Sequence, residues 1–205
     1  MFVVGIVLTL AARLGAQQEL PTFEEVVRNL TNANASLLSF RVEQAIDARA
    51  WFLRYRVLTT AYAARPARYR VVVHNLPWFM RSLGNVFAHA GRPEDVLAQY
   101  VPRVVAWKEE GGRRGLYLDL LGQRSEVNPP RAEVFVDSER WLVERVVLHY
   151  DWGEVFAESS YESISGFLLP VTVNVRIPAF YIRAVLTYQD YQLNVPVEDS
   201  MFAKK

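Results

Sequence analysis

Apolar and polar residues alternate with a period of two through most of this chain, and this alternation limits its fold more than any other feature. In residues 169–177, for example, Val173 shares one face with other aliphatic residues, whereas Asn174 shares the other with polar ones. Alternate side chains of a β-strand point to opposite faces of the sheet. Similar runs recur between residues 40 and 193, separated by turn sequences such as Gly-Gly at 111–112. The pattern predicts a sheet with one apolar face.

About ten such strands follow one another without crossover helices, which favours antiparallel pairing. A sheet of that many strands curls, splits or closes. We therefore predict a mainly β, α+β fold in which a strongly curved antiparallel sheet forms an incomplete barrel. Because 205 residues suffice for one large β domain and no linker or repeat is visible, residues 17–205 are predicted to form a single domain.

Two segments have helical periodicity instead. In residues 22–35 the apolar residues recur at spacings of three and four, and Thr22 with Glu25 has the pattern of a capping box. In residues 93–101 a proline opens the segment, and Pro102 is expected to end it. An amphipathic helix must bury its apolar side, so both helices are predicted to cover the concave face of the sheet.

The composition excludes several classes of function. The 23 basic and 22 acidic residues nearly cancel, so the chain lacks the positive charge that a nucleic-acid partner would need. The absence of cysteine excludes disulfides, thiolate metal ligands, a cysteine nucleophile and a lipid-modified cysteine. We expect no nucleic acid as a partner.

The N-terminal residues 1–16 have the pattern of a signal peptide. An apolar run in residues 2–10 is followed by small residues that end at Ala16. The run is too short for a membrane-spanning helix, which needs roughly twenty apolar residues. We therefore expect residues 1–16 to direct export and to be removed, which leaves a soluble protein in the periplasm.

No combination of residues points to catalysis or to a bound metal. His74, His89 and His149 are scattered and lack the spacing of metal ligands. The motifs of nucleophile elbows, phosphate-binding loops and dinucleotide sites are missing. Acidic residues at 109–110 and 137–139 fall in predicted turns, which favours solvated surface over a paired-carboxylate site. We expect no enzymatic activity, cofactor or metal, although a dispersed hydrolytic site would escape a motif search.

The apolar residues of the inner face are the candidates for ligand binding. They include aromatic rings, which suit either strands or an apolar cavity. The predicted cavity residues are Phe40, Val42, Leu53, Tyr55, Tyr69, Val71, Val173, Leu186 and Tyr188. Two alternatives stay open, because a filled core and a hollow interior have the same alternation.

Several short segments together resemble one known family. They are SFRVEQ at residues 39–44, RPARYR at 65–70, GFLLP at 166–170, YQDYQLN at 188–194 and DSMF at 199–202. These segments are similar to those of the LolA-type carriers, which ferry lipoproteins across the periplasm. The resemblance covers most of the chain after residue 16. It fails between residues 75 and 102, which leaves the lid and the cargo open.

The resemblance implies an incomplete barrel whose apolar mouth is covered by helices and whose interior takes acyl chains. In the family, an arginine that precedes a proline latches the lid through hydrogen bonds to main-chain carbonyls, and Arg65 stands at that position. The alternative for Arg65 is a surface charge at a turn. The function expected is a monomeric periplasmic carrier of lipoprotein acyl chains or another lipid, served by membrane-bound donor or acceptor proteins. The alternative function is a non-enzymatic envelope interaction or sensor domain with a filled core.

Overall fold

The computed structural model describes residues 19–66, 68–75, 99–123 and 129–202. The predicted signal peptide and residues 93–98 of the predicted second helix lie outside the described residues. In the described part, the α-helix α1 (Phe23–Asn32) precedes all the strands. Two short 3-10 helices, η2 (Pro178–Phe180) and η3 (Asp199–Phe202), occur near the C-terminal end. None of the described helices has the length and apolar character needed to cross a membrane.

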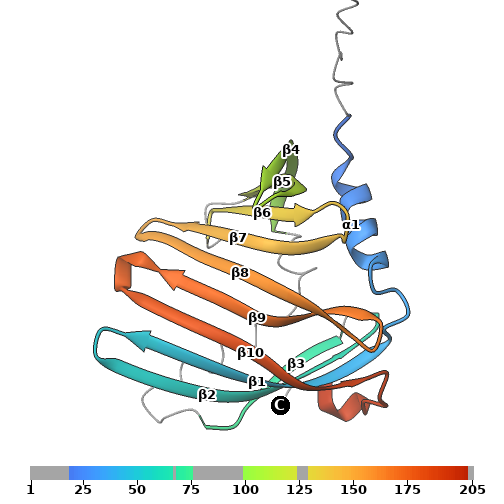
Figure 1. The fold of residues 1–205 in the computed structure, drawn as a ribbon, viewed down its shortest axis with the longest axis vertical. Helices are drawn as coiled ribbons and strands as arrows, with labels where there is room; N and C mark the ends of the chain where they lie inside the picture. Colours follow the sequence, from blue (N-terminus) through green and yellow to red (C-terminus); the bar gives the residue numbers. More distant parts are fainter. Residues whose placement is uncertain (1–18, 67, 76–98, 124–128, 203–205) are drawn as a thin grey trace, which may run out of the picture.

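Ten strands form one antiparallel sheet, in the order β3-β2-β1-β10-β9-β8-β7-β6-β5-β4. Their bounds are β1 (Ser39–Ala50), β2 (Leu53–Ala64), β3 (Arg68–Val73), β4 (Tyr100–Glu110), β5 (Arg113–Gly122), β6 (Arg131–Asp137), β7 (Leu142–Tyr150), β8 (Gly153–Ile164), β9 (Phe167–Ile177) and β10 (Ile182–Leu193). Neighbours in the sheet are neighbours in the sequence except where β1 pairs with β10 (Figure 1). The first and last strands therefore lie side by side inside the sheet, and β3 and β4 form its edges.

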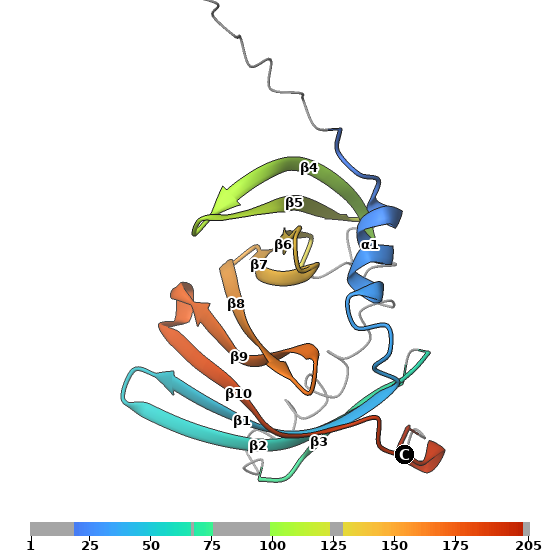
Figure 2. The ribbon, with the colours of Figure 1, turned by 45° about the vertical axis from the view of Figure 1, so that its right-hand side comes forward.

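The sheet is strongly curved, and α1 lies on its open side. Figure 2 shows the strands following an arc from β4 to β3, with α1 on the concave side. Each strand twists relative to its neighbour, so a sheet of this many strands cannot stay flat. The predicted curved antiparallel sheet, an incomplete barrel with an N-terminal helix over it, is confirmed.

Helix α1 begins where the sequence predicts. The hydroxyl of Thr22 accepts a hydrogen bond from the amide of Glu25 at 3.2 Å, and the Glu25 carboxylate accepts one from the amide of Thr22 at 2.9 Å. This reciprocal pair satisfies two amides that the first turn leaves without a partner. The helix ends at Asn32, somewhat before the predicted end at residue 35.

Helix α1 covers the half of the concave face that β4 to β7 form. Val26 is fully buried and packs with Leu116 and Leu118 of β5 and with Val136 of β6. Phe23, one turn earlier on the same side of the helix, joins this cluster. The apolar stripe of the helix and the apolar face of the sheet thus share one core.

The predicted helix at residues 93–101 is wrong at its C-terminal end. Tyr100 and Val101 belong to β4, and Pro102, expected to stop a helix, lies inside that strand opposite Leu120. Proline lacks the amide of a ladder, but edge strands such as β4 tolerate it. Tyr100 is buried, and its hydroxyl donates to the carbonyl of Pro129 at 2.7 Å. The apolar spacing that suggested a helix therefore includes a strand residue that faces the core.

Candidate ligand-binding face

The strand register places the predicted cavity residues on one face of the sheet. Residues paired across neighbouring strands point to the same face. Phe40 of β1 and Tyr69 of β3 pair with one and the same residue of β2. Val42 of β1 and Val71 of β3 likewise share another residue of β2 as their partner. The first three strands in the sequence thus direct these four side chains to one side.

The same face continues through the rest of the sheet. Leu186 of β10 pairs directly with Val173 of β9, and Tyr188 pairs with Gln44 of β1, which shares the face of Val42. The pairs of β8, β7 and β6 carry this face on to Leu118 of β5, which α1 covers. The predicted cavity residues therefore lie on the concave side, next to the half that the helix covers.

An aromatic cluster forms where β1 meets β10. The ring centroids of Phe40 and Tyr191 are 6.1 Å apart, and the stacked rings of Tyr188 and Tyr191 are 6.2 Å apart. The sequence analysis missed Tyr191, because its odd separation from Tyr188 would place it on the opposite face of a regular strand. A β-bulge between the two tyrosines returns it to the concave face. The signal was Asp190, a residue type that tolerates the positive φ found there, 53°.

A small polar group lies within this apolar face, and the sequence analysis missed it too. The hydroxyl of Thr59 donates to the side-chain carbonyl of Gln44 at 2.7 Å, and both residues are buried. The Tyr69 hydroxyl also interacts with Gln44. Because these groups satisfy one another, the face remains largely apolar toward whatever lies against it.

Four half-buried tyrosines of the concave side have a raised pKa, which reinforces their neutral form. Burial raises the pKa of Tyr69, Tyr161, Tyr188 and Tyr191 above the ordinary value for tyrosine. The hydroxyls of Tyr161 and Tyr191 donate to main-chain carbonyls at 2.6 and 2.7 Å. These side chains therefore offer neutral rings and hydroxyls, not charge.

Two predicted cavity residues lie apart from the cluster. Tyr55 and Leu53 share the concave face through their pairing with β1, but they occupy the end of β2 next to the β1–β2 turn. Tyr55 is half-buried, whereas Leu53 is 62% exposed. The structure does not bring Leu53 together with Phe40 and the tyrosines.

Arg65 connects the β2–β3 turn to the end of α1. Its Nε donates to the carbonyl of Leu37 at 3.0 Å, and its Nη2 donates to the carbonyls of Thr31 and Asn34 at 3.2 and 3.1 Å. Thr31 belongs to the last turn of α1, where carbonyls have no partner within the helix. A guanidinium has enough donors in a rigid plane to hold several carbonyls at once.

The helix is thus attached to the sheet at two places. Its first turns pack on β5 and β6 through Val26, and the segment after it is held by Arg65. The side-chain amide of Asn34 adds a bond to the carbonyl of Leu168 in β9, at 3.0 Å. Figure 2 shows α1 crossing the open side between these parts of the sheet.

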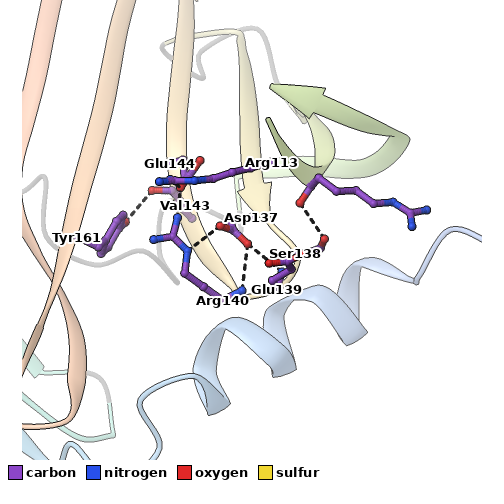
Figure 3. A network of polar contacts seen from close by, with 9 residues as sticks. Arg113, Asp137, Ser138, Glu139, Arg140, Val143, Glu144 and Tyr161 are labelled. Atoms are coloured by element: carbon purple, nitrogen blue, oxygen red, sulfur yellow. Dashed lines mark hydrogen bonds and ion pairs between the residues drawn. The ribbon is translucent and has the colours of Figure 1, made fainter. Parts of the chain in front are cut away.

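A polar network supports the β6–β7 turn beside α1 (Figure 3). The Asp137 carboxylate accepts hydrogen bonds from the amides of Glu139 and Arg140, at 2.8 and 3.0 Å, and from the Arg140 guanidinium at 2.7 Å. Arg140 also contacts Glu144. Burial acts to raise the pKa of Asp137, but these hydrogen bonds and the charge of Arg140 hold it below its ordinary value. The turn places Trp141 against the cluster under α1, so the network has a structural role.

Within the described ranges, no group of three or more histidine, cysteine or acidic side chains is placed to hold a metal. His149 lies on the convex face, 3.2 Å from Glu133 and 3.1 Å from Glu154. His74 follows β3, and His89 lies outside the described residues.

Comparison with known proteins shows a likeness of fold. No family model matches the chain, and no curated protein matches it. A LolA superfamily protein of Nitrosomonas europaea superposes with a TM-score of 0.68 at 15% identity, over 90% of this chain and 98% of that chain. A domain named for outer membrane lipoprotein sorting, from Vibrio parahaemolyticus, gives 0.70 at 10% identity, over 87% and 94%. A DUF1329 family protein of Desulfovibrio piger gives 0.67 at 12% identity, over 87% and 95%.

Proposed function

Because the chain has a LolA-like fold, we propose that it is a carrier that binds lipoprotein acyl chains or another lipid against the concave face of its sheet. It acts in the periplasm after removal of residues 1–16, as a monomer of one domain. Membrane-bound donor and acceptor proteins deliver and receive the cargo. The protein binds and releases its ligand without chemical change.

One observation carries this proposal: much of the apolar concave face is only half-buried by the protein's own side chains. Phe40, Tyr69, Leu186 and Tyr188 are all half-buried, although they lie on the inner face of the sheet. Each methylene of an acyl chain that leaves water for such a surface contributes about 0.8 kcal/mol. Affinity then depends on buried length, so a range of acyl chains is accepted.

Arg65 supports a closing role for α1 in this proposal. Two of its hydrogen bonds are exposed and the one to Leu37 is partly buried, and each contributes about 0.5–1.5 kcal/mol. Their sum favours the closed position without making it permanent. Opening at the Arg65 end would widen access to the concave face while the opposite end of α1 stays packed on β5 and β6.

Native mass spectrometry of the exported, gently purified protein tests the carrier function. We expect a polypeptide that begins at Gln17, together with an additional lipid mass that disappears on extraction with organic solvent. Lipid analysis of the extract then identifies the ligand. A bare polypeptide that takes up neither added phospholipid nor a fluorescent fatty acid would contradict the proposal.

The second candidate is a non-enzymatic interaction or sensor domain. The observation that favours it is the filled half of the concave face, where Val26, Leu116, Leu118 and Val136 are at most 3% exposed. If the other half is filled in the same way, a partner docks outside the sheet or on an edge strand. Retention of a defined envelope protein by a chain that binds no lipid would support this candidate.

A further inference from the structure

The turns at one end of the sheet carry large apolar side chains that face solvent. Trp51 and Phe52, between β1 and β2, are 79% and 84% exposed. Phe180 and Tyr181, between β9 and β10, are 50% and 73% exposed, and Trp152, between β7 and β8, is 44% exposed. Figure 1 shows these three turns one above another along one side of the sheet, opposite α1. We call these five residues the aromatic rim.

Some rings of the aromatic rim contact one another, and the backbone conformation of the turns does not require aromatic residues there. The rings of Trp51 and Tyr181 are 6.4 Å apart, and those of Trp152 and Phe180 are 4.9 Å apart. Trp51 and Tyr181 have φ angles of 54° and 53°, a conformation that suits glycine or asparagine better than a bulky side chain. These aromatic residues therefore occupy positions where folding alone favours smaller ones.

Four arginines form a row beside the rim, on the convex face. Arg54 pairs with Arg49, Arg49 with Arg183, and Arg183 with Arg176, so the row crosses four neighbouring strands. Like charges that face each other across strands destabilise a sheet. Arg176 contacts Glu158 at 3.1 Å, but the other three have no acidic partner at ion-pair distance in the part of the chain that the structure describes. We call these four residues the arginine row.

A surface groove joins the two features. Its volume is about 820 Å³, and its lining includes Arg49, Arg176 and Arg183 of the row together with Trp51 and Tyr181 of the rim. A phosphate group in this groove would meet guanidinium groups, which bind phosphate through two parallel hydrogen bonds. The rings beside it would lie at the depth of the lipid headgroups.

We propose that the aromatic rim and the arginine row form a docking surface for a lipid bilayer that contains anionic phospholipids. Tryptophan and tyrosine favour the boundary between headgroups and acyl chains, and basic residues are attracted to anionic leaflets. The rim residues lie in three separate turns at one end of the sheet and are 44–84% exposed, which suits entry into a soft interface better than insertion into a pocket of a protein. The proposal goes beyond the carrier function, because the surface lies opposite α1 and is independent of what the concave face binds.

Co-sedimentation of the full chain, purified after export, with lipid vesicles tests the charge contribution. We expect binding to vesicles of phosphatidylcholine mixed with phosphatidylglycerol, little binding to phosphatidylcholine alone, and weaker binding at high salt. Arg49→Gln combined with Arg183→Gln is expected to weaken binding about tenfold or more. The matched control, Arg28→Gln with Arg103→Gln, removes the same charge from α1 and β4 and is expected to leave binding within about twofold.

The aromatic contribution has its own pair of variants. Trp51→Ser with Phe52→Ser is expected to weaken vesicle binding about tenfold or more, because two exposed rings no longer enter the interface. Leu38→Ser with Val101→Ser removes exposed apolar side chains elsewhere and is expected to have little effect. All variants share the same N-terminal residues, so any contribution of that segment cancels.

Three results would overturn the proposal: no binding to either vesicle, equal binding to both, or unchanged binding of the arginine variant. Retention on polyglutamate-coated beads without vesicle binding would also overturn it, in favour of an acidic protein partner. Uptake of a fluorescent fatty acid, measured on the same variants, reports the concave face separately. We expect the arginine and aromatic variants to lose vesicle binding and to keep normal fatty acid uptake. Loss of both vesicle binding and uptake would indicate a folding defect, which circular dichroism detects. In that case Arg49→Lys with Arg183→Lys, which keeps the charge, must restore vesicle binding.

Discussion

Arg65 holds three main-chain carbonyls near the end of α1 with one side chain. Replacing it with leucine removes these hydrogen bonds but leaves the main chain of the turn unchanged. We expect Arg65→Leu to keep the circular dichroism spectrum of the wild type and to release a fluorescent fatty acid about tenfold faster, which corresponds to a loss of about 1–2 kcal/mol from the closed position. Stopped-flow dissociation measures this rate.

The control for Arg65 is Arg103→Leu, which removes an exposed arginine of β4. Arg65→Lys is expected to fall between the wild type and Arg65→Leu, because an ammonium donates hydrogen bonds but cannot span carbonyls as a planar guanidinium does. Equal release rates in all these variants would reduce Arg65 to a surface charge at a turn.

Asp137 links stability to pH. Burial alone would raise its pKa, but hydrogen bonds from Arg140 and Glu139 hold the pKa below its ordinary value. A carboxyl group with a lowered folded pKa stabilises the protein above its unfolded pKa of about 3.9, and this contribution is lost as the pH falls through the folded value. We expect Asp137→Asn to reduce the free energy of unfolding at neutral pH by about 1–3 kcal/mol.

Urea denaturation between neutral pH and low pH measures this effect. The difference in the free energy of unfolding between wild type and Asp137→Asn should shrink steadily once the pH falls below about 4. Asp151→Asn, at an exposed turn, is the control and should change little at any pH. A difference that stays constant with pH would mean that the charge of Asp137 is not what stabilises the turn.

The sequence predicted which face of the sheet a residue lies on better than it predicted whether the residue lies at an exposed end of its strand. Alternation is a local property, so Phe40, Val173 and Leu186 could be assigned to the same face without knowing the fold. It could not show that Leu53 lies at an exposed strand end, because exposure there depends on how far the neighbouring elements extend. Tyr191 was missed because one bulge reverses the alternation.

At the scale of elements, α1 has one fully buried residue in its contact with the sheet. Val26 is fully buried against β5 and β6, whereas Val27, next to it, is half-buried. We expect Val26→Ala to lower the free energy of unfolding by about 1.5–3 kcal/mol, because it removes buried methyl groups and leaves a cavity. Val27→Ala makes the same chemical change in the same helix and should cost less than about 0.5 kcal/mol. Chemical denaturation distinguishes the two, and equal effects would mean that α1 is not seated through Val26.

The elements themselves were predicted to different degrees. The start of α1 was predictable because a capping box is a local motif with a fixed spacing. The prediction of a helix over residues 93–101 failed at its end because the apolar residues Tyr100 and Val101 fit either a helix or an edge strand. Periodicity cannot distinguish the two over a short run. Pro102 did not decide the matter, since an edge strand accepts it.

At the scale of the whole molecule, a carrier should respond to acyl chain length. If affinity comes from burial on the concave face, each added methylene should tighten the binding of a fatty acid about fourfold, which corresponds to about 0.8 kcal/mol. The gain should stop when the chain exceeds the available surface. Calorimetry on a series of saturated fatty acids measures this slope, and affinities that do not depend on length would contradict an apolar binding face.

The curved antiparallel sheet was predictable from the sequence, but the order of the strands within it was not. The number of strands and the lack of crossover helices indicated a curved antiparallel sheet. Nothing in the alternation of β1 or β10 shows that the two pair, because each reads as a strand with one apolar face, whatever lies beside it. Solved structures with 10–15% identity share this fold, so the arrangement survives with few residues in common.

The pairing of β1 with β10 also limits when the protein can fold. The amide of Leu38 bonds to the side chain of Asn194, 156 residues later, and β10 separates β1 from β9 in the finished sheet. The β1–β3 hairpins therefore cannot join the rest of the sheet until the last strand has been synthesised. Such long-range pairing raises contact order and slows folding. The part of the sheet formed by β1 to β3 is therefore completed last, once the C-terminal strand β10 is available to pair with β1.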